Sequence, residues 1–397
     1  MCDMAKFNSE ILKWARETAG LAPAEAAKKL AIGPARGLEP EERLEKLESG
    51  ELEPSIALIR KMAKQYRRPL ISFYLSKPPA RGERGQDFRT LPDAEQRASG
   101  PLVDALIRDL KARQNMVRAL LLDDDNRDLP FIGSRRRNEG VNALVTAIEA
   151  TLKFRLAEFR AQRNEDEAFN YLRQLAEAQG IFVVLAGNLG SHHTAIDVNV
   201  FRGFALADGI APFVVINDQD AKAAWSFTLA HELAHLWLGQ SGISGARTET
   251  AIEKFCSDVA SKLLLPDIAD FAPNPRGGLV EQIDQFAHQR RISASMVTYR
   301  LFVAGTISEN QWKQIAGIFR SRWQASKEAR KAKAKLSDSG PNYYVVRRHR
   351  VGEALLSLIG RSLSEGAITP TKAGKVLGVK ARSVAPLLNT TSTPRAA

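Results

Sequence analysis

Two histidines four residues apart, with a glutamate directly after the first, constrain this chain more than any other feature. They lie in "TLAHELAHLWLG" at residues 228–239, and the 397-residue chain has only six histidines. By composition, such an H-E-x-x-H arrangement should arise by chance in roughly one chain in a hundred. Asp218 or Asp220 is expected to cap a helix that carries the motif. The apolar positions of this helix recur at helical spacing and end at a glycine: Ala223, Trp225, Leu229, Leu233, Leu236 and Gly239.

The spacing of His231 and His235 places both imidazoles on one face of that helix. There they can converge on a single tetrahedral Zn²⁺, while Glu232 lies beside the ion and can take a proton from an attacking water. A third protein ligand is needed, and the fourth position then stays open for that water. The alternative interpretation is a buried helix that binds no metal. It is unfavourable, because burying the charged carboxylate of Glu232 without a partner costs free energy.

The third ligand is expected on a later helix at 248–266. In the metzincin pattern a glycine and another histidine follow the second histidine closely, but Leu238 and Ser241 occupy those positions. The helix at 248–266 has an apolar stripe, and Glu253 flanks this stripe where its carboxylate can reach a metal on the facing helix. Three residues of the same segment remain alternatives, of which the last fits better as a small buried hydrophobe: Glu249, Asp258 and Cys256.

Hydrophobic periodicity predicts a mostly helical α+β protein with several folded units. Residues 1–75 indicate a bundle of short helices, and residues 76–100 a linker rich in proline, glycine and charge. A larger unit is expected at 101–318, a basic helix or linker at 319–350, and a small helical region with a disordered tail at 351–397.

Within the larger unit, the pattern changes from helical to strand-like. Helices are expected at 139–162 and 164–179, followed by short β-branched and aromatic segments that predict one small sheet. The expected strands cover residues 181–185, 195–200, 203–207 and 212–217. His192 and His193 lie in a loop between two of these strands, where a metal-binding role is not expected.

Cysteine content and hydrophobicity indicate a cytoplasmic protein. Cys2 and Cys256 cannot build a disulfide framework, the N-terminus lacks the apolar core of a signal peptide, and no apolar run is long enough to cross a membrane. The net charge is +12, and between residues 320 and 350 ten lysines and arginines oppose only Glu328 and Asp338. This segment is either a solvated helix and linker or a surface for nucleic acid or another acidic partner.

The segments "RGFALADGIAPFVVIND", "FTLAHELAHLWLG" and "IEKFCSDVASKLLLP" together resemble the ImmA/IrrE family of zinc metallopeptidases. The resemblance implies a zincin-like domain in which His231, His235 and Glu253 bind Zn²⁺ and Glu232 is the catalytic acid/base. It also implies a protease that cleaves a transcriptional repressor, often that of a mobile element or a stress regulon, or relieves its repression.

The N-terminal residues 1–75 resemble an XRE-type helix-turn-helix domain. Two features of this segment are unfavourable for reading DNA. Residues 38–53 hold seven glutamates against Arg43 and Lys46, and the connection "IGPARGLEPEER" is longer than a tight turn between two helices.

Two functions follow from these observations. In the first, the chain is a zinc endopeptidase that cleaves a repressor, whose extended segment adds as a strand beside residues 212–217. In the second, it is a DNA-binding regulator with a non-catalytic zinc site, and the helix-turn-helix or the basic segment 320–350 contacts DNA. Replacement of Glu232 by glutamine, with zinc retained, abolishes function only in the first case.

Overall fold

The computed structural model describes residues 7–35, 37–79, 86–87, 93–123, 128–244, 251–336 and 342–390. The chain divides into two compact units, Met1–Arg84 with Leu91–Arg108 and Gly85–Thr90 with Asp109–Ala397. Helix α5 (Asp93–Asp123) contributes residues to both units. Together with strand β1 (Gln86–Asp87), α5 occupies part of the segment expected as a linker at 76–100, so regular structure begins earlier than expected.

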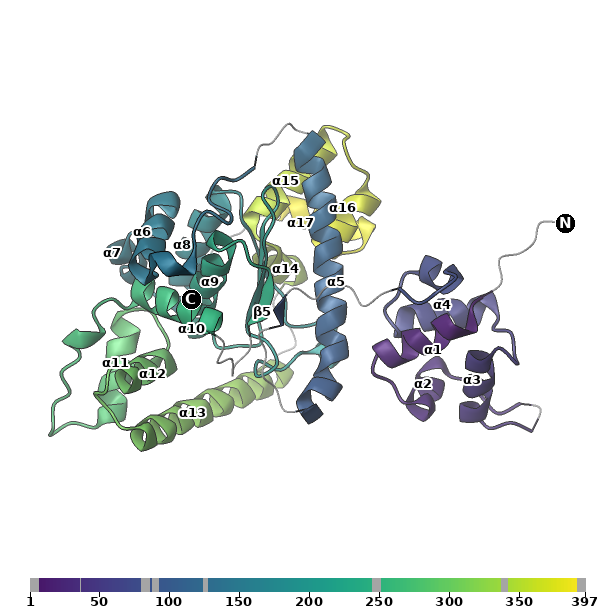
Figure 1. Cartoon of the computed structure of the whole chain (residues 1–397), viewed down its shortest axis with the longest axis horizontal. Coiled ribbons are helices and arrows are strands. Elements are labelled where there is room, and N and C mark those ends of the chain that lie inside the picture. The colour runs from purple at the N-terminus through teal and green to yellow at the C-terminus, as the bar shows by residue number, and fades with distance from the viewer. Residues whose placement is uncertain are drawn as a thin grey trace. The chain divides into compact units, whose positions relative to one another are not determined.

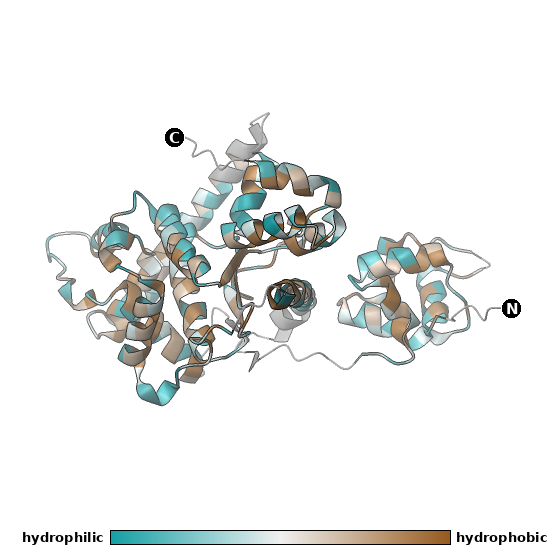
Figure 2. Cartoon of the chain, turned by 90° about the horizontal axis from the view of Figure 1, so that it is seen from above, coloured by the Kyte–Doolittle hydropathy of each residue, from teal (hydrophilic) through white to brown (hydrophobic). Residues whose placement is uncertain are grey.

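The N-terminal unit is a bundle of short helices. These helices are α1 (Ser9–Thr18), α2 (Pro23–Leu30), α3 (Pro40–Ser49) and α4 (Ile56–Gln65), followed by the 3-10 helix η1 (Leu70–Tyr74). Their apolar residues face a common core that includes Ile11, Leu44 and Ile59, and Figure 2 shows hydrophobic residues on the inner faces of the bundle. Residues 31–39 join α2 to α3, which is more chain than the tight turn of a helix-turn-helix uses. DNA binding by this unit stays a prediction.

Five strands form one mixed sheet in the second unit (Figure 1), in the order β1-β5-β3-β4-β2. The strands expected near residues 182, 204 and 214 are present as β2 (Phe182–Leu185), β3 (Gly203–Leu206) and β4 (Phe213–Ile216), while β1 and β5 (Gly242–Ser244) were not expected. β4 pairs in parallel with β2 and antiparallel with β3. Because both sides of β4 are paired, the expectation that a substrate strand adds beside residues 212–217 is wrong.

Residues 195–200 form a turn and not the expected strand. The side chain of Asp197 accepts a hydrogen bond from the backbone N–H of Asn199 at 2.8 Å, and its carbonyl accepts one from Val200 at 3.0 Å. Such local bonds compete with strand pairing. Ile196 and Val200 are nevertheless buried, which explains why the sequence alternates like a strand.

The helices before the sheet differ from expectation at one point. α6 (Val141–Leu152) ends at Lys153, which has a left-handed φ of 55°, and α7 (Leu156–Arg160) follows after a short break. A residue in this conformation stops a helix. The single helix expected at 139–162 is therefore two helices, whereas α8 (Glu165–Ala178) lies as expected.

The histidine pair lies on α9 (Lys222–Trp237), which is buried along nearly its whole length. Ala221 is the N-cap, without a side-chain bond; the side chain of Asp220 accepts instead from the adjacent Ala221 N–H, so neither expected aspartate caps the helix. α9 packs against β3 and β4 on one side and against α8 and α10 (Ala251–Leu264) on the other (Figure 1). It thus forms the centre of the largest hydrophobic core.

The remaining helices follow the sheet and α10. They are the 3-10 helix η4 (Ile268–Asp270), α11 (Leu279–Gln289), α12 (Ala294–Val303), α13 (Glu309–Leu336), α14 (Tyr343–Val351), α15 (Glu353–Ser364), α16 (Pro370–Leu377), the 3-10 helix η5 (Ala381–Ser383) and α17 (Val384–Asn389). The tail expected after residue 390 lies outside the described residues. Among the helices that the structure describes, none combines the length and the apolarity that a membrane crossing requires.

A buried ion pair on α8 forms hydrogen bonds with the backbone of the C-terminal helices. Arg173 and Glu177, both on α8, lie 3.0 Å apart between Nε and Oε1 and are almost fully buried. Arg173 also donates to the backbone carbonyl of His349 on α14. Glu177 Oε2 accepts the backbone N–H groups of Glu353 and Ala354, at the first turn of α15. Arg173 and Glu177 thus each form hydrogen bonds with the backbone of the C-terminal helices.

Candidate metal centre

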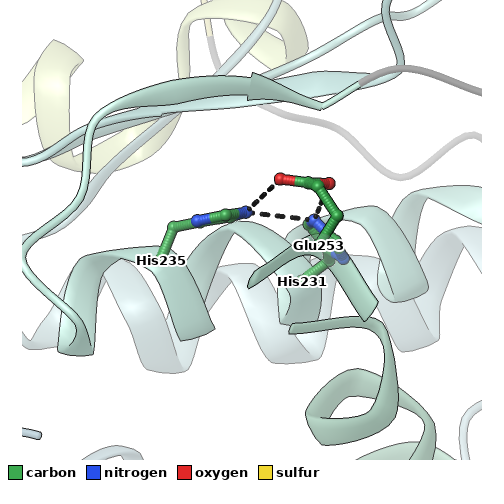
Figure 3. A group of neighbouring side chains, drawn as sticks. All are labelled: His231, His235 and Glu253. Atoms are coloured by element: carbon green, nitrogen blue, oxygen red, sulfur yellow. Dashed lines mark hydrogen bonds and ion pairs between the residues drawn. The ribbon is translucent and has the colours of Figure 1, made fainter. Parts of the chain in front are cut away.

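Three side chains from α9 and α10 meet between the two helices (Figure 3). The Nε2 atoms of His231 and His235 lie 3.2 Å apart, and each lies 3.0 Å from a different oxygen of the Glu253 carboxylate. All three side chains are buried. Within the part of the chain that the structure describes, they are the one group of histidine, cysteine or acidic residues arranged to hold a metal ion.

The separations of the three donor atoms fit a tetrahedral metal ion. Zn²⁺ binds imidazole nitrogens and carboxylate oxygens at about 2.0–2.2 Å, so that neighbouring ligand atoms lie about 3.3 Å apart. The 3.2 Å between the two Nε2 atoms is close to this edge length, each carboxylate oxygen lies 3.0 Å from one of the imidazoles, and one ligand atom from each residue lies within 4.8 Å of the other two. Two imidazoles and one carboxylate also leave a fourth position free for a water or a substrate oxygen.

Other side chains lie next to the two imidazoles of the metal group. Ser257 Oγ lies 3.3 Å from Nδ1 of His231, and the side chain of Gln240 lies near His235 and raises the pKa of its imidazole. A partner on the second ring nitrogen fixes the tautomer and orientation of a metal-binding imidazole. Neither residue was expected at the site from the sequence. For Ser257 a signal existed, since it lies four residues after Glu253 on the same face of α10.

Burial and hydrogen bonding shift the pKa values of this group. Burial raises the pKa of the Glu253 carboxyl, but the hydrogen bonds from His231 and His235 outweigh burial and hold the pKa at about 2. Burial lowers the pKa of His235 more than its hydrogen bonds with Glu253 and Gln240 raise it. At neutral pH, Glu253 is therefore a carboxylate and His235 a neutral imidazole, which are the protonation states that a metal ion requires.

Glu232 lies on α9 next to Gly203, the first residue of β3. A Cβ atom at Gly203 would lie 2.9 Å from Glu232 Oε1 and 2.6 Å from Thr228 Cγ2. Only glycine fits at this position, and Glu232 has no exposed surface. Gly203 thus defines the space for the carboxylate that follows His231. The available sequence signal was a glycine at the start of an expected strand, which marks a close backbone approach.

Of the other candidate ligands, those that the structure describes do not join this group. Glu249 lies outside the described residues. Asp258 forms an ion pair with Arg300, with 2.7 Å between Oδ1 and Nη1. Cys256 is fully buried, and burial raises the pKa of its thiol well above the usual value; a thiol that stays protonated is a poor metal ligand. The two histidines of the loop lie in the 3-10 helix η3 (His192–Thr194).

A hollow next to the metal group is lined by arginines that the sequence analysis did not single out. Its lining consists of Arg135, Arg136, Arg137, Leu238, Gln240 and Ile252. Gln240 also contacts His235, and Ile252 directly precedes Glu253, so the hollow adjoins the metal group. Adjacent guanidinium groups attract carboxylates. The run of three arginines was the signal that could have indicated this surface.

Comparison with known proteins identifies a peptidase-type domain in the centre of the chain. Residues 176–302 match the family of the IrrE N-terminal-like domain, a metallopeptidase family. The matched region contains α9, α10 and all three residues of the metal group. It does not extend to the N-terminal bundle. No curated protein and no solved structure matches the chain.

Proposed function

We propose that the chain is a zinc-dependent endopeptidase that cleaves a transcriptional repressor and so relieves repression in a stress or mobile-element response. The observation that carries this proposal is the buried convergence of His231, His235 and Glu253 inside a domain that matches a peptidase family. Two imidazoles with one carboxylate favour zinc over calcium or magnesium, because the latter two ions prefer oxygen ligands alone.

His231, His235 and Glu253 would hold the ion, which when bound polarises the scissile carbonyl and acidifies the attacking water. Glu232 acts as the general base and then delivers the proton to the leaving amine. Its position against Gly203 supports this role, because a carboxylate held in one place needs no reorganisation during proton transfer. Ser257 orients the ring of His231 and acts as a positioning residue.

The arginines beside the metal group suggest the polarity of the substrate. We propose that the segment of the repressor near the scissile bond carries aspartate or glutamate, which Arg135, Arg136 and Arg137 would pair with in the adjoining hollow. Cleavage is expected in a linker or a locally unfolded segment, because the substrate must be extended to present one peptide bond to the metal.

The test is a comparison of Glu232→Gln with the wild-type chain. Both are incubated with zinc and the repressor encoded beside the gene, and fragments are identified by intact mass. Glu232→Gln should retain zinc and fold but lose activity by about 10²–10⁴-fold, because a general base is removed. Glu365→Gln, at an exposed position after α15, is the matched control and should cleave normally. Equal inactivation of the repressor by wild type and Glu232→Gln, with no fragments, would refute proteolysis.

The second candidate is a DNA-binding regulator whose metal group is not catalytic. It is favoured by the independent helical bundle at the N-terminus. The glutamates of α3 in this bundle are unfavourable for DNA binding, because a recognition helix enters a groove lined with negatively charged phosphates. In this case Glu232→Gln would leave function unchanged.

A further inference from the structure

We infer that α16, η5 and α17 form a helix-turn-helix unit that binds duplex DNA. The turn between the two helical segments is short: α16 ends at Leu377, and only Gly378, Val379 and Lys380 precede η5. Gly378 has the left-handed φ of 65° that ends α16. A turn of three or four residues with a glycine is the connection that a helix-turn-helix uses. This inference does not depend on the proposed protease activity.

A second glycine lets the turn and the following helix pack closely on α16. A Cβ atom at Gly374 would lie 2.8 Å from the carbonyl oxygen of Val379 and 3.2 Å from the backbone nitrogen of Ala381. Any side chain at Gly374 would push the second helical segment away. The backbone contact therefore fixes how η5 and α17 lie against α16, which is the geometry that a recognition helix needs.

The inner faces of the unit are apolar and are held by α14. Five residues with helical spacing are buried: Ala373, Val376, Leu377, Val384 and Leu387. Arg347 donates to the carbonyls of Leu377 and Gly378 at the end of α16, and Arg348 donates to the last carbonyls of α17. Figure 1 shows these helices as the yellow group at the C-terminal end of the chain. The two segments thus form a supported scaffold.

The outer face is basic and polar. Lys380, Arg382 and Asn389 are exposed on η5, α17 and the turn before them. Arginine and lysine recognise guanine, and asparagine recognises adenine, from the major groove. Residues 366–390 contain four lysines and arginines and no aspartate or glutamate. α3 of the N-terminal unit, with its many glutamates, lacks this charge pattern.

The chemistry of this face favours duplex DNA over single-stranded nucleic acid. Proteins that bind single strands usually stack bases on aromatic side chains. Residues 366–390 contain no phenylalanine, tyrosine, tryptophan or histidine. The small exposed residues Ala381, Ala385 and Pro386 allow the segment to approach base edges closely. A segment with these properties suits insertion into a major groove.

The test measures binding of the full-length chain to a fluorescent 24-base-pair duplex of mixed sequence and to a randomised duplex pool, over a range of salt concentrations. Lys380→Ala/Arg382→Ala and Lys380→Glu/Arg382→Glu change two exposed residues of the outer face. Lys262→Ala/Arg276→Ala and Lys262→Glu/Arg276→Glu, at two exposed positions outside the basic segment 320–350 and the N-terminal bundle, are the matched controls, because they remove the same charges. Thermal melting of every variant checks the fold.

Wild type should bind the duplex with an affinity that falls steeply with salt, and the pool should yield a preferred sequence. The alanine pair should bind at least tenfold more weakly and lower the salt slope by about two, since about 0.9 is lost per phosphate contact. The controls should stay within about threefold of wild type. No duplex binding at low salt, equal losses in control and test variants, or equal binding of single-stranded RNA would each overturn the inference.

Discussion

The replacement of Gly203 by alanine tests whether the close approach of β3 and α9 shapes the candidate site. Gly203 does not have a left-handed φ, so alanine is compatible with its backbone. The new Cβ would lie 2.6 Å from Thr228 Cγ2, 2.9 Å from Glu232 Oε1 and 3.1 Å from the carbonyl oxygen of Val215. The threonine is β-branched in a helix and the carbonyl belongs to the paired strand β4, so neither moves easily.

We expect Gly203→Ala to lower the free energy of unfolding by about 1–3 kcal/mol, the usual cost of an added methyl group in a packed core. Thr228→Ser removes the clashing methyl and keeps the hydroxyl that donates to the Ala224 carbonyl at 3.2 Å. Alone it should cost about 1 kcal/mol, because a buried methyl is lost. The double variant should be at least about 1 kcal/mol more stable than the sum of the two single effects predicts, because serine has no methyl group to clash with the new Cβ. The two changes are therefore not additive.

The assay is urea unfolding of the full-length chain with a chelator present, followed by tryptophan fluorescence, since Trp225 and Trp237 lie on α9. Gly317→Ala is the control: nothing lies within 4 Å of its added Cβ on α13, so alanine should stabilise slightly. A wild-type midpoint for Gly203→Ala, or fully additive effects in the double variant, would refute the packing argument.

Two further predictions concern the metal group and an ion pair. Glu253→Ala should weaken zinc binding far more than Ser257→Ala, for which we expect about 10–100-fold, as measured by competition with a chelating dye; wild-type affinity of Glu253→Ala would exclude it as a ligand. Burial raises the pKa of Asp267, but hydrogen bonds from Arg160 and Arg290 outweigh it and hold the pKa at about 2. A lowered pKa means that stability is present above the unfolded pKa of about 3.9 and is lost as the pH falls through 2. Asp267→Asn should therefore cost about 2 kcal/mol at pH 7 and almost nothing at pH 2, measured by urea unfolding at both pH values; equal costs would contradict the linkage.

Local patterns account for the parts of the fold and site that the sequence predicted. α9, β2 and β4 are continuous apolar segments with clear ends, and the expected position of Glu253 followed from one helical stripe. Each of these inferences needed only residues within one element. The convergence of Glu253 with both histidines required one further assumption, that two apolar helices pack face to face.

The features that the sequence did not predict depend on contacts between distant segments or on local hydrogen bonds that compete with strand pairing. The hollow at Arg135 forms because the segment before α6 packs beside the end of α9, where the backbone N–H groups of Gly133 and Arg135 donate to the carbonyls of Leu236 and Trp237. The strand expected at 195–200 is absent because the side chain of Asp197 accepts a hydrogen bond from the backbone N–H of Asn199, which favours a turn. Apolar alternation alone cannot distinguish a buried turn from a strand.

The net charge of the segment 320–350 did not predict which of its basic side chains bind other parts of the protein. Five of the ten basic residues between 320 and 350, among them Arg322 with Glu281, bind carbonyls or carboxylates within the protein. Arg347 and Arg348 bind carbonyls at the ends of α16 and α17, and Arg350 forms an ion pair with Asp218 at 2.7 Å. Lys327 donates to the carbonyl of Gln219. Arg347 and Arg348 therefore support the C-terminal helices through their hydrogen bonds.

The ion pair of Arg173 and Glu177 decides how the C-terminal region can be studied. A chain truncated before α14 would remove the His349 carbonyl from Arg173 and two backbone donors from Glu177. Each lost hydrogen bond to a buried charged group costs about 1–3 kcal/mol, which is comparable to a large part of the stability of a domain. Loss of DNA binding or protease activity on truncation would therefore report unfolding of the shared core. Substitution of exposed residues in the full-length chain separates the two activities, because it leaves this buried cluster intact.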